Sequence, residues 1–171
     1  QPIITAVLKD DETNLKFLNL NALSHFHQKN YQEAIYEYKK LIDLGEATEQ
    51  LYENLAISYG KIFHYKKQIP IYTQLLKVYD DQNPKWHYGI GRAYFFEGAI
   101  EKAQEHIKIA LLLLDQPLDD QYLYFAATFV EQKNYKKAIE YLKIAISENS
   151  ENQMAHYQLA IAADNYYEDE K

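Results

Sequence analysis

The sequence predicts an all-α protein, a right-handed α-solenoid of stacked antiparallel helix pairs with about four repeats plus a terminal helix. Three observations lead to this prediction. Apolar residues recur at steps of three and four, which is the period of an amphipathic helix. A small residue returns every 34 or 35 positions, which indicates a structural repeat. The 171 residues include only 5 Gly and 4 Pro, a composition that favours closely packed helices joined by short turns.

Residues 122–146 show one complete helix pair. Apolar residues at positions 122, 125, 126 and 129 form one helix stripe, and a second stripe starts at Tyr135 after a polar break at residues 132–134. Ala126 lies on the first helix and Ala138 on the second. Their methyl side chains allow the two backbones to approach, whereas a Leu at either position would hold them apart.

The same small residues recur along the chain. The first-helix members are separated by 34, 35, 35 and 34 residues; they are Ala22, Ala56, Gly91, Ala126 and Ala160. Ala34 and Ala103 repeat the second-helix member. Four intervals that agree within one residue predict that each helix pair packs only on its neighbours in a continuous array.

This pattern resembles the tetratricopeptide repeat (TPR), a 34-residue helix–turn–helix with a small residue on each helix. The resemblance covers about residues 14 to 171 and depends on repetition rather than on any single motif. Three positions depart from the family pattern. Asn21 occupies a Leu position, and Gln68 stands where Ala is expected. Pro70 suggests that its helix starts late, near Lys66 or Lys67, or is bent there.

The repeat frame divides the chain into consecutive segments. Residues 1–13 are an N-terminal tail or a remnant helix, and Thr13 or Asn14 is expected to cap the first helix. The repeats are residues 14–47, 48–82, 83–117 and 118–151, with Gly45 expected to end the second helix of the first repeat. Residues 152–171 form a half repeat or capping helix.

Composition and charge exclude several functional classes. The net charge is −7, which argues against a nucleic-acid partner because phosphate binding needs a basic surface. The longest apolar run, Ile109–Leu114, is too short to span a membrane, which takes about 20 residues. The absence of Cys fits a cytoplasmic protein and an exported or periplasmic bacterial protein equally well.

No catalytic, metal or cofactor site is expected. The six His residues are scattered, and His25 and His27, the only close pair, point to opposite sides of a helix, whereas metal ligands favour i, i+4 spacing. Carboxylate pairs such as Asp119 and Asp120 lie at helix starts, where they stabilise the helix dipole. No nucleophile motif or phosphate-binding loop is recognisable. The chain is therefore expected to be non-enzymatic.

The resemblance implies a concave surface lined by the first helices of the repeats. It projects a partner-binding set that is rich in aromatic side chains: Phe26, Glu53, Lys61, Tyr88, Arg92, Phe95, Phe96, Tyr124 and Tyr157. Aromatic rings bury much area at a small entropy cost, and Arg can anchor a carboxylate. The alternative is that several of these side chains pack between adjacent first helices.

The main functional hypothesis is a scaffold that binds a peptide or protein segment in this groove. Some relatives clamp a carboxylate terminus with Lys and Asn. Here the clamp positions hold Asn19, Leu23 and Asn54, and only Lys85 and Arg92 are basic, so that clamp is incomplete. Two alternatives stay open: self-association into a homo-oligomer, and an interaction segment of a larger protein with a separate effector or catalytic domain.

Overall fold

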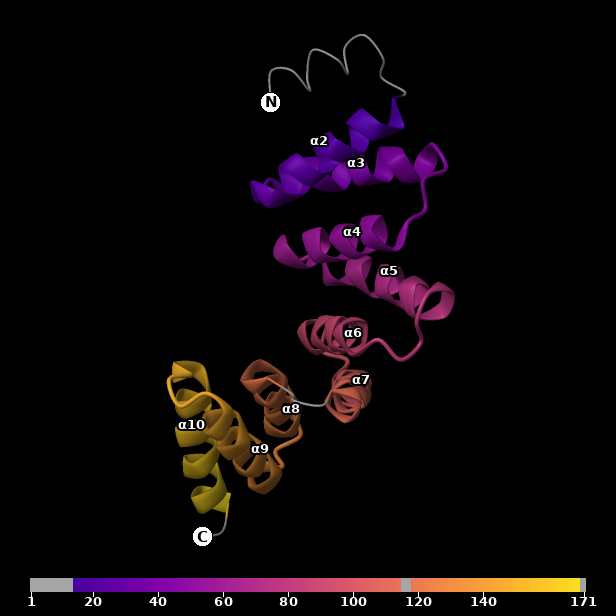
Figure 1. Cartoon of the computed structure of the whole chain (residues 1–171). Coiled ribbons are helices and arrows are strands. Elements are labelled where there is room, and N and C mark those ends of the chain that lie inside the picture. Colours follow the sequence, from indigo (N-terminus) through magenta and orange to yellow (C-terminus); the bar gives the residue numbers. More distant parts are fainter. Residues whose placement is uncertain (1–13, 115–117, 170–171) are drawn as a thin grey trace. The chain divides into compact units, whose positions relative to one another are not determined.

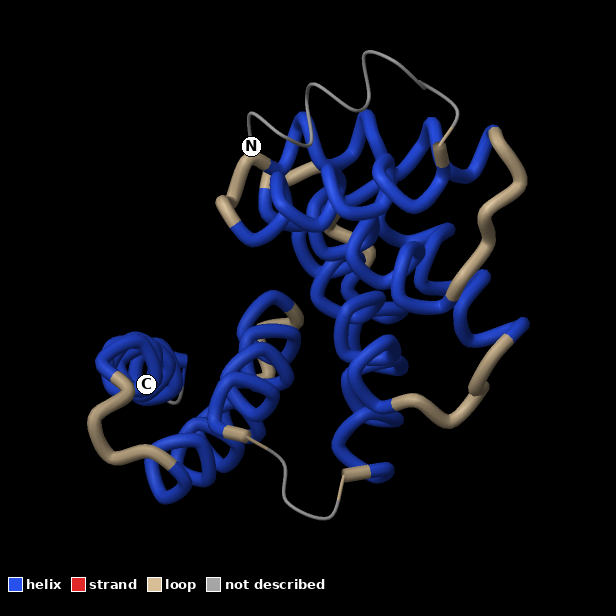
Figure 2. Tube along the Cα trace, turned by 45° about the horizontal axis from the view of Figure 1, so that its top comes forward, coloured by secondary structure: helices blue, strands red, loops and turns tan. Residues whose placement is uncertain are grey.

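The computed structural model describes residues 14–114 and 118–169, and within these residues all regular structure is helical (Figure 2). Four helix hairpins are followed by a terminal helix (Figure 1). The helices are α2 (Leu15–His27), α3 (Tyr31–Asp43), α4 (Glu49–Lys61), α5 (Tyr65–Val78), α6 (Pro84–Phe96), α7 (Ile100–Leu113), α8 (Asp119–Glu131), α9 (Tyr135–Glu148) and α10 (Gln153–Asp169). The predicted all-α class is confirmed. The predicted tail, residues 1–13, lies outside the described residues.

The chain divides into two compact units, which are called unit 1, up to Asp81, and unit 2, from Gln82 onward. In unit 1 the hairpins α2/α3 and α4/α5 stack through contacts between α3 and α4. In unit 2, α7 packs on α8, α9 packs on α10, and the first helices α6 and α8 also touch. Each unit therefore has its own core, built by adjacent hairpins.

The small residues of the repeat lie at the centre of these cores. Six of the predicted alanines have no exposed surface: Ala22, Ala34, Ala56, Ala103, Ala126 and Ala138. Large side chains fill the space beside them, including Tyr38 in unit 1 and Leu142 in unit 2, both with 0% exposure. The methyl groups let paired helices approach, as the repeat frame predicted.

The terminal helix corrects one prediction. Ala160 was expected to be the buried small residue of α10, but it is exposed, and Ala155 and Ala162 are buried instead. In the third repeat the residue at this position, Gly91, lies against Ala103 and Ile107 on the second helix of its own pair. Within the described residues α10 has no such partner, so its buried face is the one that packs on α9 and α8.

Each hairpin turns through one residue in the left-handed region. These residues recur at the repeat interval, with φ of 63° at Lys29, 61° at Phe63, 74° at Gly98 and 57° at Lys133. In the first turn the N–H of Asn30 donates to the carbonyl of His25 at 2.9 Å, which is the six-to-one bond of a Schellman motif. Asn14 caps α2, as expected, by accepting from the N–H of Phe17 at 3.4 Å.

Pro70 led to two expectations for helix α5, of which the late start is wrong and the bend stays a prediction. Helix α5 begins at Tyr65, earlier than Lys66 or Lys67, and continues through Pro70 to Val78. Pro70 has no N–H to donate to the helical ladder, but the buried side chains of Tyr65 and Tyr72 hold the helix on both sides of it. The helix start therefore follows the core contacts rather than the proline.

Candidate functional site

The candidate site begins with one stripe of helix α6. Asn83 caps this helix by accepting from the N–H groups of Lys85 at 3.1 Å and Trp86 at 3.3 Å, and Pro84 occupies its first position. Trp86 is buried against the core and fixes the rotation of the helix. The predicted residues Tyr88 and Arg92, spaced i, i+4, therefore share a face that is only partly buried.

Tyr124 on helix α8 is the centre of an aromatic cluster. Its ring centroid lies 6.3 Å from that of Tyr88, 5.8 Å from that of Phe95 and 5.8 Å from that of Phe96. All three contacts are edge-to-face, the arrangement favoured by the ring quadrupoles. Phe95 and Phe96 also contact each other at 5.6 Å. The first helices of two adjacent repeats thus bring four predicted rings together; we call them, with Arg92, the α6–α8 cluster.

A cation lies over this cluster. The Cζ atom of Arg92 is 5.9 Å from the ring centroid of Tyr124, within the range of a cation–π contact. The contact orients the guanidinium, whose N–H groups can also bind a carboxylate in a fork geometry. Arg92 is half-buried, so its charge is partly shielded from water.

Tyr88 remains a neutral hydrogen-bond donor. Burial raises the pKa of its hydroxyl, and the negative charge of Asp120 raises it further, against the opposing effect of Arg92. The hydroxyl donates to the backbone carbonyl of Asp120 at 3.4 Å, near the start of α8. This bond ties α6 to α8 next to the aromatic rings.

The α6–α8 cluster stays open to solvent on one side. Phe96 is 45% exposed, and Phe95 and Tyr124 are half-buried. Side chains that only packed between helices would be buried on every side, as Phe125 and Phe129 are in the same unit. The cluster therefore offers an apolar surface with one oriented cation beside it.

The other predicted site residues do not join this cluster. Phe26 in unit 1 packs partly against that unit's core and contacts the ring of Tyr31 at 6.1 Å. Glu53 is half-buried on α4, and Lys61 is exposed in the last turn of the same helix. Tyr157 on α10 is 61% exposed. A single groove that includes all nine residues stays a prediction.

Asn54, one of the positions of the incomplete carboxylate clamp, is hydrogen-bonded within unit 1. Asn54 is only 5% exposed. Its side-chain amide donates to the hydroxyl of Tyr38 at 3.1 Å, and its side-chain oxygen accepts from Gln50 at 3.0 Å. Both polar ends of Asn54 are therefore used inside the fold.

Two other kinds of site are absent from the described part of the chain. No helix there is long and apolar enough to cross a membrane. No group of three or more His, Asp or Glu side chains there could hold a metal ion.

Sequence reasoning missed one surface of unit 1. Lys39, Tyr59 and Lys67 line cavities on the side of the second helices. The repeat frame places the expected binding surface on the first helices, so it does not point to this one. The sequence does contain a pattern that could have indicated this surface, because Lys and Ile alternate at helical spacing on α3 and α5.

Comparison with known proteins identifies the fold. No family model matches the sequence, and no curated protein matches it significantly. Among solved structures, YrrB, described as a TPR protein with an unusual peptide-binding site, has a TM-score of 0.79 at 18% identity, over 90% of this chain and 78% of its own. MamA from Desulfovibrio magneticus RS-1, from residue 41 to its end, has a TM-score of 0.76 at 17% identity, over 88% of this chain and 84% of its own.

A third similar structure contains a bound peptide. The first TPR of Spaghetti (RPAP3), bound to the HSP90 peptide SRMEEVD, has a TM-score of 0.65 at 18% identity and covers 70% of this chain and 93% of its own. Identities this low show the fold alone. The chain has the tetratricopeptide-repeat fold, as the repeat pattern predicted.

Proposed function

We propose that this TPR-fold chain is a non-enzymatic interaction scaffold that binds a segment of a partner protein at the α6–α8 cluster. The bound segment carries an apolar or aromatic side chain for the rings and a carboxylate for Arg92. The third repeat, which supplies Tyr88, Arg92, Phe95 and Phe96, is the energetic centre of the site.

The observation that carries this proposal is the convergence of three rings and one guanidinium on Tyr124. These side chains already contact one another, so little rotamer entropy is lost when a partner binds. Partly exposed aromatic and Arg side chains at one point are typical of binding hot spots. A ring from the partner would complete the edge-to-face network on its open side.

Two of the similar structures support a peptide partner in general terms. YrrB is described by its peptide-binding site, and the Spaghetti domain holds a peptide with three acidic residues. The carboxylate anchor proposed here is not the Lys and Asn clamp of some relatives, because the side chain of Asn54 is hydrogen-bonded to Tyr38 and Gln50. Arg92 takes that role in the proposal.

The test is a selection of peptides from a phage-displayed random library on the intact chain, followed by affinity measurements. Phe95→Ala together with Arg92→Ala is expected to lower the affinity of the chain for the selected peptides by at least about tenfold, or 1.4 kcal/mol. Helicity measured by circular dichroism should stay unchanged. Leu112→Ala, which removes a 75% exposed side chain from α7 in the same unit, is the matched control. Equal affinity for the double variant and the control would exclude the α6–α8 cluster as the site at which the selected peptides bind.

A second candidate function is self-association through α10. Its exposed side includes Met154 at 53%, Tyr157 at 61% and Tyr167 at 65% exposure, next to the exposed Ala160. Exposed apolar side chains around a small residue suit helix–helix contact between two copies. Light scattering across a dilution series tests it: a dimer that Tyr157→Ser dissociates supports this function, and a monomer at all concentrations excludes it.

A further inference from the structure

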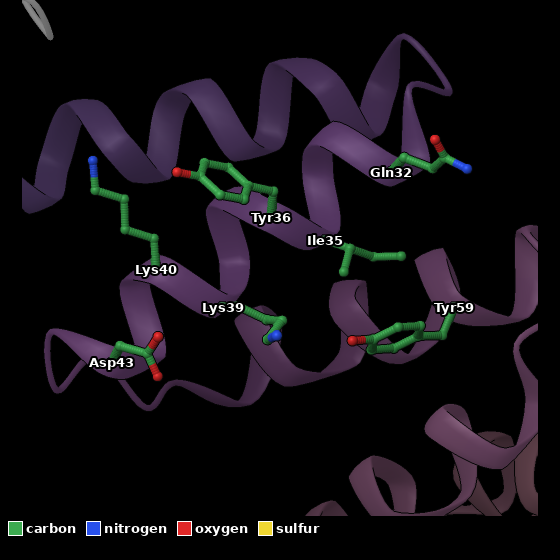
Figure 3. Close-up of a pocket in the computed structure, with 7 residues that line it drawn as sticks. All are labelled: Gln32, Ile35, Tyr36, Lys39, Lys40, Asp43 and Tyr59. Carbon is green, nitrogen blue, oxygen red and sulfur yellow. The ribbon is translucent and has the colours of Figure 1, made fainter.

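Two adjoining cavities lie against the second helices of unit 1. The first, of about 470 Å³, is lined by side chains of α3 and by Tyr59 (Figure 3). The second, of about 270 Å³, extends from α3 across α4 to α5. Both are lined by Lys39, Asp43 and Tyr59, so they form one continuous depression. We call it the α3–α5 groove.

The floor of the groove is apolar and comes from three helices. On α3, Ile35 and Ile42 are spaced i, i+7 and lie on the stripe that faces the groove. Leu55 of α4 and Ile71 of α5 continue this floor. Figure 3 shows Ile35 directed toward the space in front of the ring of Tyr59. Most of these side chains belong to the edge of the core of unit 1, so the fold fixes their positions.

The rim of the groove is basic. Lys39 and Lys40 on α3 and Lys67 on α5 provide three ammonium groups, whereas Asp43 is the single carboxylate among the lining residues. The whole chain has a net charge of −7, so the charge of this part of the surface is opposite in sign to that of the whole chain. Lysine stems can lie along an apolar floor while their charged ends stay in water. The groove therefore attracts carboxylates at its rim and apolar groups at its floor.

Pro70 shapes the α5 wall of the groove. It lines the cavity beside Lys67 and Ile71 and presents an apolar ring there. On the opposite wall Tyr36 is 67% exposed next to Lys40. The larger cavity lies within the range of about 300–1,000 Å³ that is typical of ligand sites, and the smaller one lies just below it. These dimensions suit a short segment of a partner better than a broad flat interface.

We propose that the α3–α5 groove is a second binding site, which takes an acidic segment of a partner protein with an apolar side chain at its centre. The apolar side chain fills the space above Ile35, Ile71 and the ring of Tyr59. The flanking carboxylates pair with Lys39 and Lys67 on the two walls. This site lies within unit 1 and uses second helices, so it is separate from the α6–α8 cluster.

The test isolates the groove by removing the other site. A phage-displayed library of twelve-residue peptides is selected on the full chain carrying Phe95→Ala and Arg92→Ala. Enriched peptides are expected to combine Asp or Glu with a Leu, Ile, Met or Phe. Lys39→Glu together with Lys67→Glu is expected to lower the affinity of these peptides by at least about tenfold, since like charges across an interface repel. Both lysines are exposed, so the fold should persist.

A matched control separates a local site from a general effect of charge. Lys108→Glu with Lys143→Glu changes the net charge equally at exposed positions of unit 2 and should leave affinity within twofold. The proposal is overturned if the selection enriches no acidic and apolar sequence, or if both double variants weaken binding equally. It is also overturned if Lys39→Glu with Lys67→Glu instead abolishes self-association or binding of a labelled single-stranded oligonucleotide, because the groove would then serve another partner.

Discussion

Gly91 of α6 lies so close to Ile107 of α7 that a Cβ atom placed on Gly91 would come within 2.6 Å of Cγ1 of Ile107 and 2.9 Å of its backbone nitrogen. The second contact involves backbone, so it cannot be relieved by a rotamer change. The two helices of the third repeat are therefore in contact at the residue that the repeat pattern identified as small. Their separation also sets where Arg92, the next residue, is presented to Tyr124.

Replacing Gly91 should destabilise the chain. Gly91→Ala forces α6 away from α7, and overpacking of this kind costs about 1–3 kcal/mol. This cost should exceed the gain of roughly 1 kcal/mol that Ala provides over Gly within a helix. Urea unfolding followed by fluorescence of the buried Trp86 measures the difference. Unchanged or increased stability would contradict the close approach of the two helices.

Gly60 and Gln68 should show strong coupling. A Cβ on Gly60 would collide with Nε2 of Gln68, the long side chain that replaces the usual Ala. Gly60→Ala forces the amide end of Gln68 to move, which should offset the gain of roughly 1 kcal/mol that Ala provides over Gly within a helix. On a Gln68→Ala background this gain should appear in full. The coupling should be about 0.5–3 kcal/mol in a double-mutant cycle. Additive effects would mean that the two positions do not share space.

Gln68→Ala alone should cost less stability than most truncations of a buried side chain. Gln68 is 4% exposed, and its Oε1 atom is buried without a hydrogen-bond partner. An unsatisfied buried acceptor costs about 1–3 kcal/mol, which offsets the packing lost on truncation. Gln68→Ala should therefore be milder than the several kcal/mol typical of core truncations.

Neighbouring alanines on α10 should respond differently to enlargement. Ala162→Leu introduces a large side chain at a position with 0% exposure and should cost about 1–3 kcal/mol. Ala160→Leu adds the same atoms at an exposed position and should stay within about 0.5 kcal/mol. Thermal unfolding of the two variants compares them directly. The opposite order would restore the register that the sequence alone had predicted for this helix.

Unit 2 should lose stability in mild acid through a histidine pair. Nδ1 of His87 and Nδ1 of His106 are 3.1 Å apart, between α6 and α7. Burial lowers the pKa of His106 from its ordinary value of 6.5, and His87 lowers it further, whereas Glu105 opposes the shift. Because the folded pKa is the lower one, this stabilisation is complete above about pH 6.5. It is lost as the pH falls from there through the folded pKa.

The pH dependence can be assigned with a single variant. His106→Gln removes the titrating group, so its unfolding free energy should depend less on pH between 7.5 and 5 than that of the unchanged chain. His156→Gln, at an exposed position of the same unit, is the control and should keep the original slope. Equal slopes for the chain and both variants would assign the acid sensitivity to other groups.

Periodicity was sufficient to predict the hairpins. Tightly packed helices tolerate only small residues at their points of contact, so Ala22, Ala56 and Ala126 mark those points in the sequence itself. The register of α10 could not be predicted this way. Ala155, Ala160 and Ala162 all fit a small position, and which of them is buried depends on the neighbouring helices.

The candidate site was predictable only in part. The first-helix frame placed Tyr88, Arg92 and Tyr124 on one surface, but their contacts depend on how adjacent hairpins stack. The α3–α5 groove was not predicted, because its residues come from three helices whose relative positions follow from tertiary packing. Pro70 also did not predict where α5 starts, because buried side chains on both sides of the proline hold this helix.

The most direct test of the central claim is to map bound peptide on the intact chain by NMR chemical-shift changes. A peptide selected on the chain that carries Lys39→Glu and Lys67→Glu, which removes the α3–α5 groove, should produce its largest shifts at Tyr88, Arg92 and Tyr124. Tyr124→Ala should abolish these shifts without loss of helicity. Shifts confined to α10, or spread evenly over the surface and unaffected by Tyr124→Ala, would contradict the assignment of the α6–α8 cluster as the binding site.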